Sequence, residues 1–178
     1  MKELIDSSTL PQLETLLDNL EQRAQKSARP AEQARIHNLA GDMCVDANQL
    51  ERGLSYYDKA ITTYSDCEQY DSAGRICEKI LALSPSSVRP YSTLAWLALK
   101  RGREEEARRR IVQYVDAADT HGLARLARGY LVKLADLAKS NDVLQTIADG
   151  LLQLEDSEAA NSVYGRMARS NQSNMRAR

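Results

Sequence analysis

Residue types that could perform catalysis are few and scattered along this chain. Its two histidines, His37 and His121, are 84 positions apart, and neither has an obvious cysteine or aspartate partner in the sequence. The chain also lacks a glycine-rich phosphate loop, a G-x-S-x-G elbow and an H-E-x-x-H zinc motif. We therefore expect a protein that is not an enzyme and that carries no cofactor.

The three cysteines are Cys44, Cys67 and Cys77. Their odd number and the absence of a C-x-x-C pair argue against a disulfide framework and against a zinc site, so no metal is expected. Cys44 and Cys77 fall at apolar positions of expected helices, which favours buried small hydrophobic side chains. Cys67 lies near an expected turn, where it would be a free thiol.

The charge balance points away from nucleic acid and membrane surfaces as main partners. The chain has 24 Lys and Arg against 25 Asp and Glu, which gives a net charge of -1. No apolar run approaches the roughly 20 residues that span a bilayer, and the N-terminus has no hydrophobic signal core. We expect a cytoplasmic protein that binds a protein or a peptide.

The densest charge run is found at residues 103–110. Glu104, Glu105 and Glu106 each precede an arginine by four positions. Pairs at this spacing stabilise a helix surface. The run therefore predicts a solvated helix face and not a binding patch.

Composition and apolar periodicity predict helices throughout. Phe is absent, β-branched residues are scarce, and no stretch alternates as a strand would. Proline, glycine and capping residues divide the chain into nine helices. Their connections of two to five residues make successive helices antiparallel. The expected helices run from Ser8 or Thr9 to Arg29, and over about 31–47, 50–65, 68–83, 88–100, 103–118, 123–139, 141–153 and 157–169.

Three stretches of the chain repeat one spacing of small and large apolar residues. This spacing is typical of a pair of packed helices, and its repetition indicates a solenoid. The expected fold is all-α, a right-handed α-α superhelix of about nine antiparallel helices. It would comprise an N-terminal amphipathic helix at 1–30 packing on the array, a repeat domain at 31–170 and a flexible tail at 171–178. The three copies are His37, Ala40, Gly41, Cys44, Gly53, Tyr57, Ala60; Tyr91, Leu94, Ala95, Ala98, Gly102, Ala107, Ile111, Tyr114; and Leu144, Ile147, Ala148, Leu151, Ala160, Tyr164, Met167.

The copies resemble tetratricopeptide repeats, which are helix pairs of about 34 residues. The resemblance is carried by Leu94-Ala95 with Ala107, by Gly41 with Tyr57 and Ala60, and by Ile147-Ala148 with Ala160 and Tyr164. The small residues that should pack between helices, Gly53, Ala73, Ala107 and Ala160, are 20, 34 and 53 positions apart. Only one gap has the regular length, so the other two indicate single helices inserted into, or replacing, pairs.

The resemblance implies a partner-binding groove lined by the first helix of each pair. Trp96, the only tryptophan, is the strongest candidate anchor, although packing against a neighbouring helix is the alternative. The acids Asp42 and Asp149 would repel a peptide carboxylate, so a carboxylate clamp is not expected. By position the groove candidates are Arg35, Asn38, Asp42, Val45, Arg89, Ser92, Trp96, Lys100, Gln145, Asp149 and Leu152.

The resulting hypothesis is a non-catalytic scaffold or adaptor that holds a peptide or helix of a partner on its concave face. A self-associating structural protein is the alternative, as a homodimer formed through the seventh helix or through the N-terminal stripe of Leu10, Leu13, Leu17 and Leu20. An RNA-binding helical repeat is a third possibility, against which the acids Asp42, Asp46 and Asp149 argue.

Overall fold

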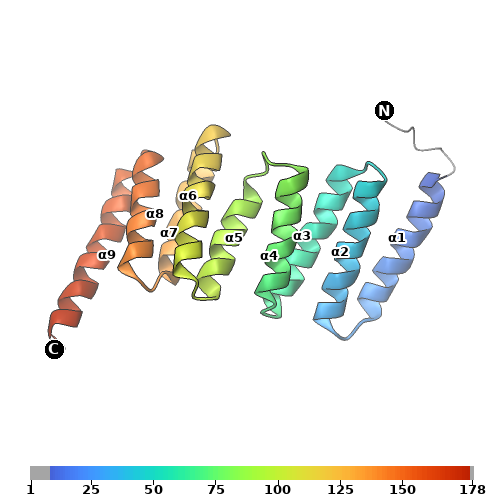
Figure 1. Cartoon of the computed structure of the whole chain (residues 1–178), viewed down its shortest axis with the longest axis horizontal. Helices are drawn as coiled ribbons and strands as arrows, with labels where there is room; N and C mark the ends of the chain where they lie inside the picture. The colour runs from blue at the N-terminus through green and yellow to red at the C-terminus, as the bar shows by residue number, and fades with distance from the viewer. Residues whose placement is uncertain (1–8, 177–178) are drawn as a thin grey trace. The chain divides into compact units, whose positions relative to one another are not determined.

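The computed structural model describes the backbone of residues 9–176 and the side chains of residues 11–169. Over this range the chain forms nine helices and no strand, and within each of its two units successive helices are antiparallel, which confirms the expected all-α fold (Figure 1). Ser8, a possible cap, and the last two residues of the expected tail lie outside the described range. The helices are α1 (Thr9–Lys26), α2 (Pro30–Asp46), α3 (Leu50–Asp66), α4 (Tyr70–Leu83), α5 (Arg89–Lys100), α6 (Glu104–Thr120), α7 (Ala124–Leu137), α8 (Asn141–Gln153) and α9 (Ser157–Arg176).

The residues group into two compact units, 1–80 and 81–178. The division falls within the last turn of α4. Helix α9 continues to Arg176, into the segment that was expected to be a flexible tail.

In unit 1, side chains connect each helix to the one two places further along. Arg52 and Lys59 of α3 pair with Glu14 and Glu21 of α1 at 2.5 Å each. Lys79 of α4 reaches α2. Helix α2 packs against both α1 and α3. The unit therefore has two layers, α1 with α3 and α2 with α4 (Figure 1).

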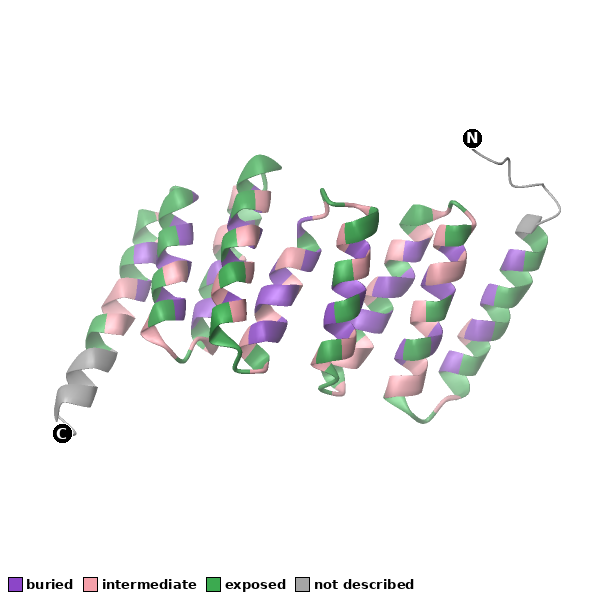
Figure 2. Ribbon diagram, viewed as in Figure 1, coloured by how far each residue is buried: buried purple, intermediate pink, exposed green. Residues whose placement is uncertain are grey.

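The apolar stripe of α1 is buried in unit 1. Leu13, Leu17 and Leu20 are 7%, 1% and 7% exposed and pack in one cluster with residues of α2 and with Tyr56 of α3. Figure 2 shows the same division in each helix, with one buried side and one exposed side. Cys44 and Cys77 are fully buried, which confirms the expectation that both act as small hydrophobic residues.

Helices α2 and α3 lie close together where two glycines face each other. A Cβ added to Gly41 would lie 2.5 Å from Cε1 of Tyr57 and 3.2 Å from the carbonyl oxygen of Gly53. A Cβ on Gly53 would lie 2.7 Å from Cγ2 of Val45. The small residues of the repeat pattern are therefore required here by backbone proximity.

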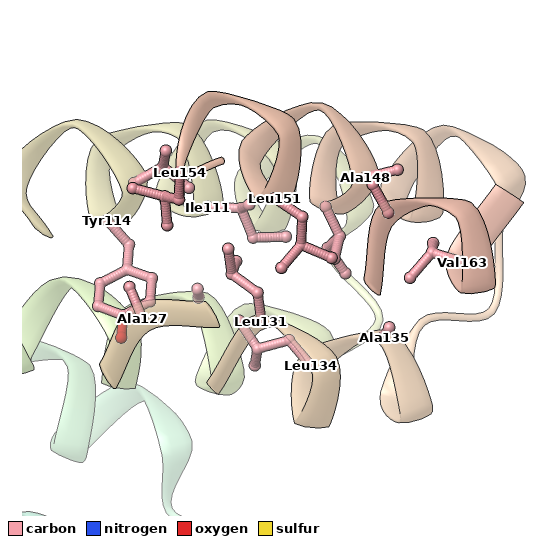
Figure 3. Close-up of a cluster of buried hydrophobic side chains, with 14 of the residues drawn as sticks. Ile111, Tyr114, Ala127, Leu131, Leu134, Ala135, Ala148, Leu151, Leu154 and Val163 are labelled. Carbon is pink, nitrogen blue, oxygen red and sulfur yellow. The ribbon is translucent and has the colours of Figure 1, made fainter. Parts of the chain in front are cut away.

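Unit 2 has the same kind of layering. Arg108 and Asp116 of α6 bond to Thr146 and Gln153 of α8 at 3.3 and 3.1 Å. Arg166 of α9 reaches α7, which also contacts α5. Helices α6 and α8 therefore form one layer, and α5, α7 and α9 form the other. Between them lies a core that contains Ile111, Leu131, Leu134, Leu151 and Leu154 (Figure 3).

Five helices end in the same left-handed turn. The residues that follow α2, α3, α5, α6 and α8 have φ between 56° and 68°. In each case the next amide donates to a carbonyl in the last helical turn, as in a Schellman motif. The five residues are Asn48, Glu68, Gly102, Gly122 and Glu155.

In the charge run at the start of α6, the pairing of Glu105 differs from the expectation. Glu105 pairs with Arg108, three positions on, at 2.9 Å, and not with Arg109. Glu106 turns back to Arg101 at 3.0 Å and to Arg103 at 3.5 Å. The run still belongs to a self-paired helix surface.

Candidate binding faces

A polar network connects α2, α3 and α4 in unit 1. The Lys79 ammonium donates to Oδ1 of Asn38 at 3.0 Å and to Oδ1 of Asp42 at 2.7 Å. The hydroxyl of Tyr57 donates to the same Asp42 oxygen at 2.5 Å. Burial, followed by this bond to Asp42, raises the pKa of Tyr57 above its usual value. The network fixes the amide of Asn38 on the outer side of α2.

Two pockets flank α2 and share Asn38. The pocket on the α4 side has a volume of about 270 Å³ and is lined by Asn38, Tyr64, Ser72, Arg75, Ile76 and Lys79. The pocket on the α1 side has about 380 Å³ and is lined by Leu20, Arg23, Glu32, Arg35, Ile36, Asn38, Leu39 and Asp42. The two pockets make α2 the centre of one polar surface with apolar patches, here called the α2 face.

The α2 face carries more positive than negative charge. Four cations line the two pockets, Arg23, Arg35, Arg75 and Lys79, against the two acids Glu32 and Asp42. Glu32 pairs with Arg35 at 3.0 Å and Asp42 with Lys79. Asp42 was expected to repel an anionic ligand. In the structure the ammonium of Lys79 lies beside it and offsets its negative charge.

Three of the four groove candidates on α2 lie on this face. Arg35, Asn38 and Asp42 line the pockets. Val45 instead points at α3, since its Cγ2 atom lies beside Gly53. It contributes to the packing of the hairpin.

The candidates on α5 occupy a different environment. Ser92 is 7% exposed and its hydroxyl donates to the carbonyl of Arg89 at 2.8 Å. Trp96 is partly buried and packs against the core of unit 2. The Lys100 ammonium lies 5.4 Å from the centre of the Trp96 ring. Part of the Trp96 side chain therefore packs against neighbouring helices, as in the alternative interpretation.

The candidates on α8 are all exposed. The amide of Gln145 donates to Asp149 at 2.8 Å, and the Tyr164 hydroxyl of α9 donates to Asp149 at 2.8 Å. This bond raises the pKa of Tyr164. Leu152 is 45% exposed. These residues form one stripe on the outer side of α8.

The structure does not bring the α5 and α8 candidates together, because they lie in different layers of unit 2. Antiparallel helices alternate between layers, so one inserted helix reverses the layer of every helix after it. Helix α7 is the inserted helix between the α5–α6 and α8–α9 pairs. The groove candidates were chosen by their position in the repeat, which assumed that α5 and α8 line the same groove.

The residues that sequence reasoning missed belong mainly to α4. Arg75 and Lys79 supply two of the four cations of the α2 face, and Tyr64 and Ser72 line the same pocket. The sequence did contain an indication of this site, because Arg75 and Lys79 are four positions apart and so lie on one side of α4. These residues were missed because the groove candidates were taken by position from the first helix of each repeat pair alone.

A further pocket, of about 530 Å³, lies between α7 and α9 in unit 2, and its lining includes Asp136, Glu158 and Arg166. No group of three or more His, Cys, Asp and Glu is placed among the described residues to hold a metal ion. His37 contacts Glu21 at 3.5 Å through Nε2, and its Nδ1 is buried without a hydrogen bond. No helix in this part of the chain is both long and apolar enough to cross a bilayer.

Layered antiparallel hairpins with small residues at their contacts define a helical-repeat protein. Within this class, residues 66–129 match the tetratricopeptide repeat family, from the end of α3 to the middle of α7. The family resemblance inferred from sequence is thereby confirmed over that stretch. A solved structure described as "MamA RS-1 ArsTM double mutant" has 16% sequence identity to this protein. The match covers 91% of this chain and 96% of that chain, with a TM-score of 0.29. No curated protein shows significant similarity to the chain.

Proposed function

We propose that this protein is a non-catalytic adaptor that binds a segment of a partner protein on the α2 face. The tetratricopeptide repeat match supports a role in protein–protein interaction. The observation that carries the choice of surface is the pair of adjoining pockets that share Asn38. An extended segment that crosses α2 would occupy both pockets in turn and bond to Asn38 between them.

The charge of the α2 face indicates the chemistry of the segment. Arg23 and Arg75 are lining cations without an acidic partner among the lining residues. Leu39, 48% exposed, and the buried Ile36 and Ile76 offer apolar contacts at the same place. The segment should therefore combine acidic and apolar side chains, because charge selects the partner and apolar burial supplies affinity.

Affinity capture from native lysate, followed by mass spectrometry, tests this proposal. The wild-type chain is compared with Asn38→Ala/Arg75→Ala, with Trp96→Ala and with Arg125→Ala, an exposed arginine on α7 that serves as the matched control. We expect a small set of proteins that the double variant loses and the control retains. Loss with Trp96→Ala alone would move the site to α5, and an identical set for all four chains would refute both assignments.

Self-association is the second candidate, and one observation favours it at α7. Leu126 and Val132 on that helix are 71% and 42% exposed. The N-terminal stripe is a poorer interface, since Leu13, Leu17 and Leu20 are already buried within the chain. Light scattering over a concentration range, with Leu126→Glu as the comparison, tests it: a mass that rises with concentration only in the wild type supports a dimer through α7.

A further inference from the structure

The hairpins α2–α3 and α8–α9 carry small residues and a tyrosine at matched positions. Gly41, Gly53 and Tyr57 in the first hairpin correspond to Ala148, Ala160 and Tyr164 in the second, each 107 positions later. The left-handed residues Asn48 and Glu155 that follow α2 and α8 have the same offset. The two hairpins can therefore be compared residue by residue.

The polar groups on their outer sides also correspond. Asp42 accepts the Tyr57 hydroxyl at 2.5 Å, and its counterpart Asp149 accepts the Tyr164 hydroxyl at 2.8 Å. One turn earlier each hairpin has a side-chain amide, Asn38 in the first and Gln145 in the second. Both hairpins thus present a carboxylate and an amide held in a fixed arrangement.

The two sites differ in what neutralises the carboxylate. At the first hairpin, the ammonium of Lys79 on α4 bonds to both Asn38 and Asp42. At the second, the bonds to Asp149 come from Gln145 and Tyr164, and no cation among the described side chains pairs with it. Asp149, Gln145 and Leu152 are exposed, as is Asp142 at the start of the same stripe.

Helix α4 shows what fits such a site. Its Arg75, Ile76 and Lys79 line the pocket beside α2, with Ile76 buried between the two basic residues. The outer stripe of α8 offers Asp149, which matches Asp42, and in addition the acid Asp142 and the half-exposed Leu152. This acidic and apolar stripe is complementary to a helix with two basic residues four positions apart and an apolar residue beside them.

We propose that the outer stripe of α8, together with Tyr164 of α9, docks a basic amphipathic helix of a partner protein. A lysine or arginine of that helix bonds to Asp149 and Gln145 as Lys79 bonds to Asp42 and Asn38. Leu152 packs on an apolar residue of the same helix, and Asp142 pairs with the second base. The proposal rests on the adaptor function, but uses a surface and a partner chemistry separate from those of the α2 face.

A peptide with the sequence of α4 itself is the probe. Residues 68–84, helix-stabilised, blocked at both ends and with Cys77→Ser, are added to the full chain labelled with ¹⁵N. We expect chemical shift changes at Gln145, Asp149 and Leu152 and none at Asn38 and Asp42, where the chain's own Lys79 is already bound. Binding should weaken as salt is added, because exposed charges are screened.

Matched variants test the pairing. Asp149→Asn should weaken binding roughly fivefold, as expected for one exposed ion pair. Asp119→Asn, the same change at an exposed position near the end of α6, should leave it unchanged. The peptide with Lys79→Gln should bind the wild-type chain about fivefold more weakly as well. Combining that peptide with the Asp149→Asn chain should cause no further loss of affinity.

Three outcomes would overturn the proposal. They are no shift changes at millimolar peptide, equal affinities for the Asp149→Asn and Asp119→Asn chains, and shifts at α8 that depend on protein concentration alone, which would make a second copy the occupant. Because the titration needs no natural partner, its failure leaves the capture experiment on the α2 face unaffected, and the reverse holds as well.

Discussion

The ammonium of Lys79 lies 2.7 Å from Oδ1 of Asp42, which precedes it by 37 positions. The two side chains are 37% and 38% exposed, and their pairing joins α4 to α2 within unit 1. Similar side-chain contacts join α1 to α3 and α6 to α8, 37 or 38 positions apart. These contacts connect alternate helices, α1 with α3, α2 with α4 and α6 with α8.

Replacing Lys79 by Gln should lower the free energy of unfolding by about 0.5–1 kcal/mol at low salt, the usual range for a partly exposed pair. The loss should shrink at 1 M NaCl because salt screens the pair. Urea unfolding followed by circular dichroism measures both values. Lys139→Gln, at an exposed position after α7, is the control. Equal losses for the two variants at low salt would contradict a role for the Lys79 pair.

Gly41→Ala should destabilise the protein by about 1–3 kcal/mol, the usual cost of overpacking a tight contact. Its Cβ would lie 2.5 Å from the Tyr57 ring and 3.2 Å from the Gly53 carbonyl oxygen. Gly129→Ala on α7 meets nothing within 4 Å, so it should instead stabilise the helix by roughly 0.5–1 kcal/mol. Thermal and urea unfolding of both variants provide the test, and a change of the same sign in both would refute the close-approach argument.

Stability should fall as the pH is lowered through the range in which His37 titrates. Burial lowers the pKa of His37, although Glu21 opposes the shift, so the unfolded chain binds a proton at a higher pH than the folded chain does. The contribution of His37 is therefore complete above the unfolded pKa, near 6.5, and is lost as the pH falls towards the lower folded value.

Urea unfolding between pH 8 and pH 5.5 measures this dependence. His37→Gln should remove most of the decline, whereas His121→Gln, at an exposed position after α6, should preserve it. Burial would raise the pKa of Glu21, but the Lys59 ammonium holds it below its usual 4.5, so the contribution of Glu21 is lost only as the pH falls below that value. A slope above pH 5.5 that survives in His37→Gln would show that another group is responsible.

Gly102→Ala should cost about 1–2 kcal/mol even though the added methyl group meets no neighbour. The residue has φ of 68°, a conformation that glycine adopts without steric cost. Gly165→Ala, inside α9 and also with open space around it, is the control and should be neutral or stabilising. A neutral Gly102→Ala would mean that the turn after α5 can rearrange. Differential scanning calorimetry of the two variants separates these cases.

Much of the local structure could be predicted from the sequence because its causes are local. Three of the expected helices end shortly before Asn48, Gly102 and Gly122, residue types that tolerate positive φ, and all three adopt it. The structure assigns the cap of α9 to Asp156, whose Oδ1 accepts the amide of Ala159 and which directly precedes the expected helix start at residue 157. The glycines and alanines of the repeats identified the close helix contacts, because only small residues allow them.

The composition of the binding faces depends on which helices lie side by side, and no local sequence pattern determines that. Arg35, Asn38 and Asp42 were placed on one surface, but Arg75 and Lys79 join them only because α4 lies beside α2. Trp96 and Asp149 have similar positions in their repeat copies, yet they lie in different layers of unit 2. Each single helix inserted between pairs reverses the layer of the helices that follow.

By itself, then, the sequence determined the nine helices, their antiparallel succession and the small residues at their contacts, since propensity, capping and spacing act over a few residues. Tertiary structure decided which helices share a layer, which charges become neighbours 37 or 38 positions apart, and that Asp42 has an ammonium beside it while Asp149 is left exposed. The physical reason is that layer membership is set by packing between helices, and so by the helices that intervene as well as by the repeat motif.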